Sequence, residues 1–116
     1  MPSFSQLETH EYKFDPLINS SSLEHWYNSI RNIDLSLLSI GDICRACRQK
    51  IYCKQTGAEA IKRLQQNPYA GELFDGELLD SLSYGSIDEW AFSDEQKSIF
   101  AQIASAALNG NINLDE

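Results

Sequence analysis

Residues 39–53 read "SIGDICRACRQKIYC", and this stretch decides the fold class. Its apolar residues recur at spacings of three and four, at Ile40, Ile43, Cys44, Cys47 and Ile51. That spacing places them on one face of an α-helix, with the basic residues mostly off this face. Ser39 and Asp42 have the spacing of an N-terminal cap. The stretch therefore predicts a helix from about Ile40 to Cys53 that packs through its apolar face.

Three further helix starts are indicated by capping boxes, in which a Ser is followed three residues later by Glu or Gln. The pairs are Ser21 with Glu24, Ser86 with Glu89, and Ser93 with Gln96. The first pair precedes apolar residues at helical spacing, namely Leu23, Trp26, Tyr27 and Ile30. We expect helices to begin near all three serines.

Two more short helices are expected between these. Thr56-Gly57 suits the end of the helix that begins at Ile40, so residues 58–66 predict a separate helix that Asn67-Pro68 ends. Asp75 is expected to cap a short helix that holds the apolar residues Leu78, Leu79 and Leu82.

The fold class that follows is mainly α, a single compact domain of about five or six short helices. No long alternating strand pattern follows residue 20, and the chain contains no valine. Tyr12 and Phe14 alternate with charged residues, which allows a short extended N-terminal segment. We expect an N-terminal arm packed on the domain (1–20), a helical domain (21–110) and an acidic tail (111–116).

Composition restricts the partners. The 116 residues carry a formal net charge of -8, which argues against nucleic acid or an anionic membrane as a direct ligand and favours basic partners. No apolar run is long enough to span a membrane, and the N-terminus lacks a signal-peptide pattern. An odd number of cysteines suits a reducing compartment, so a cytoplasmic location is expected.

Cys44-x-x-Cys47 invites a zinc or redox interpretation. A structural zinc site needs four ligands in closing pairs, and the remaining candidates, Cys53, His10 and His25, form no second pair. Both sulfurs lie on the apolar face of the expected helix, which favours buried, inert thiols. We expect no catalytic residue, metal or cofactor, with a small Cys-based metal or redox module as an alternative.

The charges are segregated along the chain. Between Arg45 and Arg63 lie six of the nine Lys and Arg residues, whereas residues 72–95 hold eight acids and no base. Helix dipoles account for several of these acids individually, and a solvated acidic face is the alternative. We favour a docking face for a basic partner. Its candidate contacts are Glu72, Asp75, Glu77, Asp80, Asp88, Glu89 and Trp90. Phe74 and Phe92 are expected in the core, and Tyr84 is left open.

Three segments together resemble a known family. They are "LSLLSIGDICRACRQ" (35–49), "AIKRLQQNP" (60–68) and "GELFDGELLDSLS" (71–83). Their order is similar to that of a helical family of immunity proteins, which protect bacteria that carry contact-dependent growth inhibition (CDI) systems from their own toxin. Residues 50–57 depart from the family pattern, because polar and charged residues precede the glycine, and this leaves the helix boundary there open.

The resemblance implies a protein that is not an enzyme and that binds one cognate toxin domain, the C-terminal region of a large exoprotein, as a 1:1 heterodimer. Toxins of these systems are commonly nucleases, so an RNase is expected. A nuclease needs a basic cleft for phosphates, and an acidic protein can cover that cleft. The alternative is a helical regulatory subunit that binds another basic protein.

Overall fold

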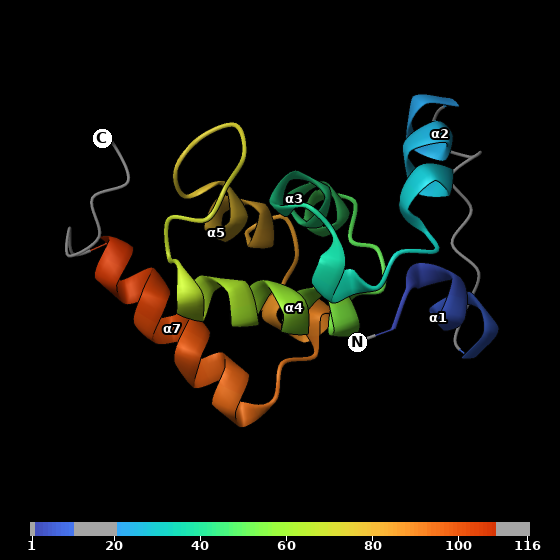
Figure 1. The fold of residues 1–116 in the computed structure, drawn as a ribbon. Coiled ribbons are helices and arrows are strands. Elements are labelled where there is room, and N and C mark those ends of the chain that lie inside the picture. Colours follow the sequence, from blue (N-terminus) through green and yellow to red (C-terminus); the bar gives the residue numbers. More distant parts are fainter. Residues whose placement is uncertain (1, 11–20, 109–116) are drawn as a thin grey trace. The chain divides into compact units, whose positions relative to one another are not determined.

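The computed structural model describes residues 2–10 and 21–108 (Figure 1). These residues form seven α-helices and no strand beyond one isolated bridge, so the expectation of a mainly α fold is confirmed. The chain divides into two compact units, Met1–Leu38 and Ser39–Glu116. Tyr12 and Phe14 lie outside the described residues, as do residues 111–116. The expected division into an arm, a domain and a tail stays a prediction.

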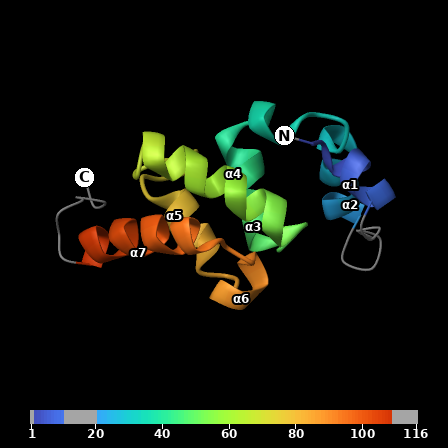
Figure 2. The ribbon, with the colours of Figure 1, turned by 90° about the horizontal axis from the view of Figure 1, so that it is seen from below.

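The second unit is built around one central helix. Its elements are α3 (Ile40–Arg48), α4 (Cys53–Gln66), α5 (Glu77–Leu82), α6 (Ile87–Trp90) and α7 (Asp94–Leu108). α4 packs against the four others, and α3 packs most closely against α5 (Figures 1 and 2). The core of this unit includes the fully buried side chains of Ile43, Ile51, Ile61, Leu64, Leu78 and Leu82.

The boundary between α3 and α4 differs from the prediction. α3 ends at Arg48 rather than near Cys53, because Lys50 and Tyr52 adopt positive φ angles of 54° and 44°, which no helix accommodates. The turn buries the side chain of Tyr52 almost completely, to 1% exposure. Burial of this large ring offsets the backbone strain.

Gly57 lies inside α4 and does not end a helix. A Cβ atom here would lie 3.0 Å from Cε1 of Phe92 and 3.2 Å from Cε3 of Trp90. The missing side chain therefore lets two aromatic rings pack directly on the helix backbone. The predicted helix over residues 58–66 is therefore present as part of α4 and ends at Gln66 as expected, but it begins at Cys53, because Gly57 continues the helix rather than ending one.

Helix capping follows the predicted pattern at α3, α6 and α7. Ser39 Oγ accepts a hydrogen bond from the Asp42 N–H at 3.1 Å. Reciprocal bonds join Ser86 with Glu89 and also Ser93 with Gln96, as in complete capping boxes. Each satisfies backbone N–H groups that the first turn of a helix leaves without a partner.

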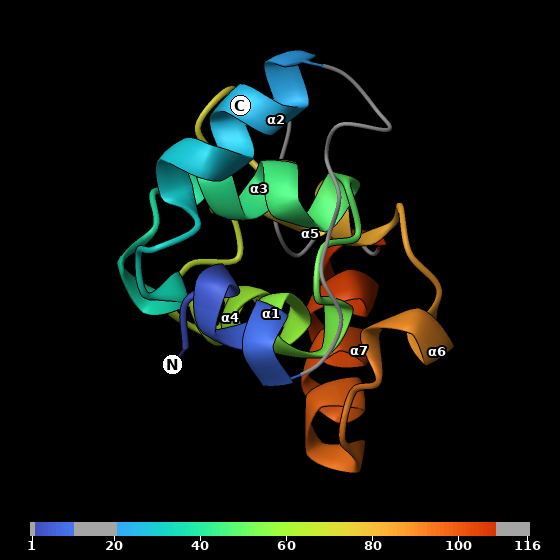
Figure 3. The same ribbon diagram turned by 90° about the vertical axis from the view of Figure 1, so that its right-hand side faces the viewer.

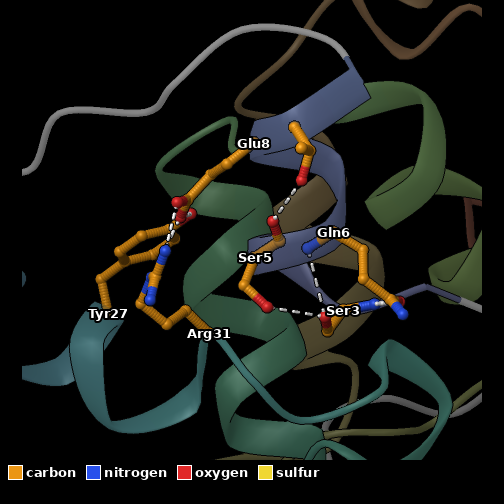
Figure 4. A network of polar contacts seen from close by, with 7 residues as sticks. Ser3, Ser5, Gln6, Glu8, Tyr27 and Arg31 are labelled. Atoms are coloured by element: carbon orange, nitrogen blue, oxygen red, sulfur yellow. Dashed lines mark hydrogen bonds and ion pairs between the residues drawn. The ribbon is translucent and has the colours of Figure 1, made fainter.

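The first unit contains α1 (Phe4–His10), α2 (Ser21–Ile30) and a 3₁₀ turn (Leu35–Leu37) (Figure 3). α1 was not expected, although its cap has the same sequence signature as the others. Ser3 N–H donates to Gln6 Oε1 at 2.9 Å, and Gln6 N–H donates to Ser3 Oγ at 3.3 Å (Figure 4). The Ser-x-x-Gln spacing at residues 3–6 would have identified this helix.

One carboxylate ties α1 to α2. Arg31 pairs with Glu8 through both Nη2 and Nε, the latter 3.1 Å from Glu8 Oε2 (Figure 4). The Tyr27 hydroxyl donates to the same oxygen at 2.7 Å, and the Tyr27 ring stacks on buried Phe4 at a centroid distance of 5.7 Å. The N-terminal helix is thus held by apolar packing and by a bidentate ion pair.

Candidate functional site

The seven candidate contacts separate into exposed and buried groups. Glu77 and Trp90 are only 2% and 1% exposed. The other five side chains are exposed: Glu72, Asp75, Asp80, Asp88 and Glu89. Burial removes the side chains of Glu77 and Trp90 from the accessible surface of this chain, against the expectation of an exposed face, and the other five residues remain predicted contacts.

Trp90 belongs to the core. Its indole Nε1–H donates to the carbonyl oxygen of Leu82 at 2.9 Å, and its ring stacks with that of Phe92 at 6.4 Å. Phe92 is buried, as expected, and contacts Phe100 of α7 at a centroid distance of 5.8 Å. The rings of Trp90 and Phe92 lie beside Gly57, and Phe100 contacts the Phe92 ring.

Glu77 is a structural carboxylate at the start of α5. Its Oε2 lies 3.0 Å from Nη1 of Arg48 on α3, which also donates to Ser81 Oγ at 3.3 Å. Its Oε1 accepts the backbone N–H groups of Glu72 at 2.8 Å and Leu73 at 3.0 Å. Each charged oxygen is therefore matched by donors, which is how a buried charge becomes tolerable.

The balance of these contacts sets the pKa of Glu77. Burial alone would raise the pKa of the carboxyl group. The Leu73 and Glu72 N–H groups and the Arg48 guanidinium favour the charged form, and together they lower the pKa below its ordinary value. Glu77 therefore remains a carboxylate at neutral pH and orders the chain that precedes it.

That chain, the 67–76 loop, is the broad yellow loop between α4 and α5 (Figure 1). Gly76 N–H donates to the Tyr69 carbonyl at 2.9 Å, and Leu78 N–H donates to the Ala70 carbonyl at 3.0 Å. A Cβ atom on Gly71 would lie 2.2 Å from the Phe74 carbonyl oxygen, so the loop closes tightly on this glycine. The loop has a fixed shape rather than that of a loose linker.

The cap of α5 also differs from the prediction. The N-cap residue is Gly76, with φ 87° and no side-chain hydrogen bond, so Asp75 does not cap this helix. The Asp75 side chain is exposed instead. The Glu77 carboxylate accepts hydrogen bonds nearby, but from the loop N–H groups of Glu72 and Leu73 and not from N–H groups in the first turn of α5.

Large apolar side chains are exposed beside these acids. Leu73 is 75% exposed and Phe74 52% exposed, which corrects the expectation that Phe74 lies in the core. After α5, Tyr84 and Ile87 are 55% and 43% exposed. The segment from residue 72 to residue 88 thus combines exposed acids with exposed apolar groups, a mixture that occurs at protein interfaces.

Folding brings some of the distant bases back to these acids. Lys50 Nζ lies 3.3 Å from Glu89 Oε2, and Arg48 pairs with Glu77 as above. Within the described part of the chain, no ion pair forms at Asp75, Asp80 or Asp88. These three carboxylates are therefore uncompensated negative charges of the segment.

Unlike these three carboxylates, that of Glu72 lies close to another helix, α3. Its carboxylate lies against Gly41 in the first turn of α3, where an added Cβ atom would come within 2.2 Å of Glu72 Oε2. The Glu72 carboxylate therefore lies beside the N-terminal end of α3. Glu72 remains exposed and can also contact a partner.

The cysteines provide no metal centre among the described residues, where no group of three or more His, Cys, Asp or Glu side chains could hold an ion. Cys44 and Cys47 are buried on α3, and Cys53 is partly exposed at the start of α4. Burial raises the pKa of Cys44 to about 11 and that of Cys47 further. Thiols with such pKa values are poor nucleophiles and poor ligands at neutral pH.

An ordered loop that presents acids and apolar side chains is typical of a protein-binding module. A family model described as "CDI immunity proteins" matches residues 8–103. The match covers most of the chain, so the chain belongs to the family of CDI immunity proteins, as the three sequence segments suggested. Membership implies that it neutralises the toxin of a contact-dependent growth inhibition system. No curated protein matches the chain. In the described part of the chain, each helix is too short or too polar to cross a membrane.

Proposed function

We propose that this chain acts in the bacterial cytoplasm as the immunity partner of one CDI toxin, a nuclease of the RNase type. It binds the C-terminal toxin domain of the cognate exoprotein as a 1:1 complex and covers the basic cleft of that domain. Family membership over residues 8–103 is the observation that carries this proposal. The surface in contact comprises the exposed acids Glu72, Asp75, Asp80, Asp88 and Glu89.

Electrostatics supports this assignment. A nuclease cleft must present Lys and Arg side chains to the phosphates of its substrate. The uncompensated carboxylates of Asp75, Asp80 and Asp88 supply the opposite potential, which speeds encounter and favours one orientation. Exposed acids of this kind affect the association rate and its salt dependence more than the lifetime of the complex.

A matched pair of charge reversals tests the acidic surface. The first pair, the test variant, carries Asp75→Lys and Asp80→Lys. The control pair carries Asp94→Lys and Glu95→Lys, at exposed acids near the start of α7, and changes the net charge by the same amount. The probe is an inactivated toxin domain of the cognate exoprotein, with binding followed by surface plasmon resonance at several salt concentrations. We expect the first pair to weaken binding by about tenfold or more and to flatten its salt dependence.

The control pair should change affinity by less than about threefold, because it lies outside the proposed contact. Equal losses in both pairs would mean that only net charge matters, and no loss in either would refute the acidic surface. Covering of the cleft is tested separately with active toxin. A stoichiometric amount of this protein should stop cleavage of RNA, and a complex that still cleaves RNA would refute the covering of the cleft.

A further inference from the structure

Leu73 and Phe74 are adjacent, large and apolar, and both are exposed, to 75% and 52%. Single exposed apolar side chains are ordinary on soluble proteins and need no explanation. Two adjacent large apolar side chains that are both exposed, in a loop held by hydrogen bonds, leave more apolar area in water than a single side chain does. We call Leu73 and Phe74 the apolar tip of the 67–76 loop.

The loop holds this tip in place before any partner binds. Leu73 N–H donates to the buried carboxylate of Glu77, and the Phe74 carbonyl accepts the Glu77 N–H at 3.2 Å. Glu77 is in turn held by Arg48. The backbone on both sides of the tip is therefore fixed to the start of α5, and binding requires little further ordering of the chain.

The charges beside the tip indicate what covers it. Glu72 and Asp75 flank the tip directly in sequence, and both are exposed. An apolar centre with acids at its edge matches a pocket that is apolar inside and basic at its rim. Aromatic and large aliphatic side chains at such a centre commonly dominate the binding free energy.

We propose that the apolar tip is the anchor of the complex with the toxin. Leu73 and Phe74 insert into an apolar pocket of the toxin domain, and Glu72 and Asp75 meet basic side chains at the rim of that pocket. Glu77 contacts no toxin atom and is a positioning residue that holds the loop. This inference rests on the proposed function and adds the residues that determine the lifetime of the complex.

A double substitution, Leu73→Ala with Phe74→Ala, tests the anchor. We expect affinity for the inactivated toxin domain to fall by about fiftyfold or more, mainly through faster dissociation. Leu37 provides a matched control, because it is a leucine with nearly the same exposure, 77%. Leu37→Ala should change affinity by less than about twofold, and all variants should keep the circular dichroism spectrum of the unaltered chain.

The role of Glu77 is tested by a double-mutant cycle. Glu77→Ala should weaken binding of the otherwise unaltered chain but have little further effect once the tip residues are alanine, since its contribution acts through the tip. Amide hydrogen exchange at Glu72 and Leu73 should become faster in Glu77→Ala and less so in Glu77→Gln, which keeps an acceptor oxygen. Equal losses of affinity in both backgrounds would refute the positioning role.

The outcomes distinguish this inference from the proposed function. If the unaltered chain binds and inhibits the toxin while the tip variant binds equally well, the anchor is refuted and the proposed function stands. If the unaltered chain does not bind the toxin, both fail. If the tip variant loses only self-association in sedimentation experiments, the tip contacts a second copy of this chain, and the anchor is refuted.

Discussion

The carboxylate of Glu77 offers the sharpest test of how the 67–76 loop is stabilised. Glu77→Ala removes three charge-assisted hydrogen bonds, from the N–H groups of Glu72 (2.8 Å) and Leu73 (3.0 Å) and from Arg48 (3.0 Å). Each such bond contributes about 1.5–3 kcal/mol net. Their sum overestimates the loss, because the Arg48 side chain is 30% exposed and can be hydrated again. We expect the free energy of unfolding to fall by about 2–4 kcal/mol.

Asp75→Ala is the matched control for this substitution. It removes the same charge two residues away, from an exposed side chain, and should change the free energy of unfolding by less than about 0.5 kcal/mol. Urea denaturation followed by tryptophan fluorescence measures both, since Trp90 is buried in the same unit. A loss below about 1 kcal/mol for Glu77→Ala, or equal losses for the two variants, would refute the role assigned to Glu77.

The same carboxylate predicts a pH dependence. The pKa of Glu77 is lower in the folded chain than its ordinary value of 4.5, because its donors outweigh the effect of burial. As the pH falls, Glu77 is therefore protonated in the unfolded chain before it is protonated in the folded chain. The stabilisation by its carboxylate is complete above about pH 4.5 and is lost as the pH falls through the lower pKa of the folded chain. Glu77→Gln should lose less stability than the unaltered chain between about pH 5 and pH 3. Parallel pH profiles would contradict the lowered pKa.

Three further substitutions or measurements test other parts of the structure. Gly71→Ala should lower the free energy of unfolding by about 1–3 kcal/mol, because the Cβ atom of the new alanine would lie 2.2 Å from the Phe74 carbonyl oxygen. A change within about 0.5 kcal/mol in urea denaturation would contradict this. Tyr27→Phe should lower the free energy of unfolding by about 1 kcal/mol, since it removes the 2.7 Å hydrogen bond to Glu8 but keeps the stacking on Phe4. Thermal unfolding measures this loss, and an unchanged melting temperature would contradict it. Ellman's reagent should modify only Cys53 in the folded chain and all three cysteines in urea, because Cys44 and Cys47 are buried and Cys53 is partly exposed. Stoichiometric zinc in elemental analysis would contradict the inert role of the cysteines.

Local signals in the sequence predicted the helix starts well. The Ser-x-x-Glu and Ser-x-x-Gln spacings mark the starts of α6 and α7, because a cap depends on residues three apart and on little else. The same reasoning could have found α1, where Ser3 and Gln6 form reciprocal bonds. The end of α3 was not predictable in this way, since it depends on how deeply Tyr52 is buried by the rest of the unit.

The sequence by itself determined the α class, the negative charge and the family. The tertiary structure alone decided which acids are available to a partner. Asp75 and Glu77 are two residues apart and look equivalent in the sequence, yet Asp75 is exposed and Glu77 is buried against Arg48, 29 residues away. Phe74 was expected in the core and is exposed, whereas Trp90 was expected at the surface and is buried. A side chain is buried only when distant elements supply the apolar surface and the hydrogen-bond partners that replace water.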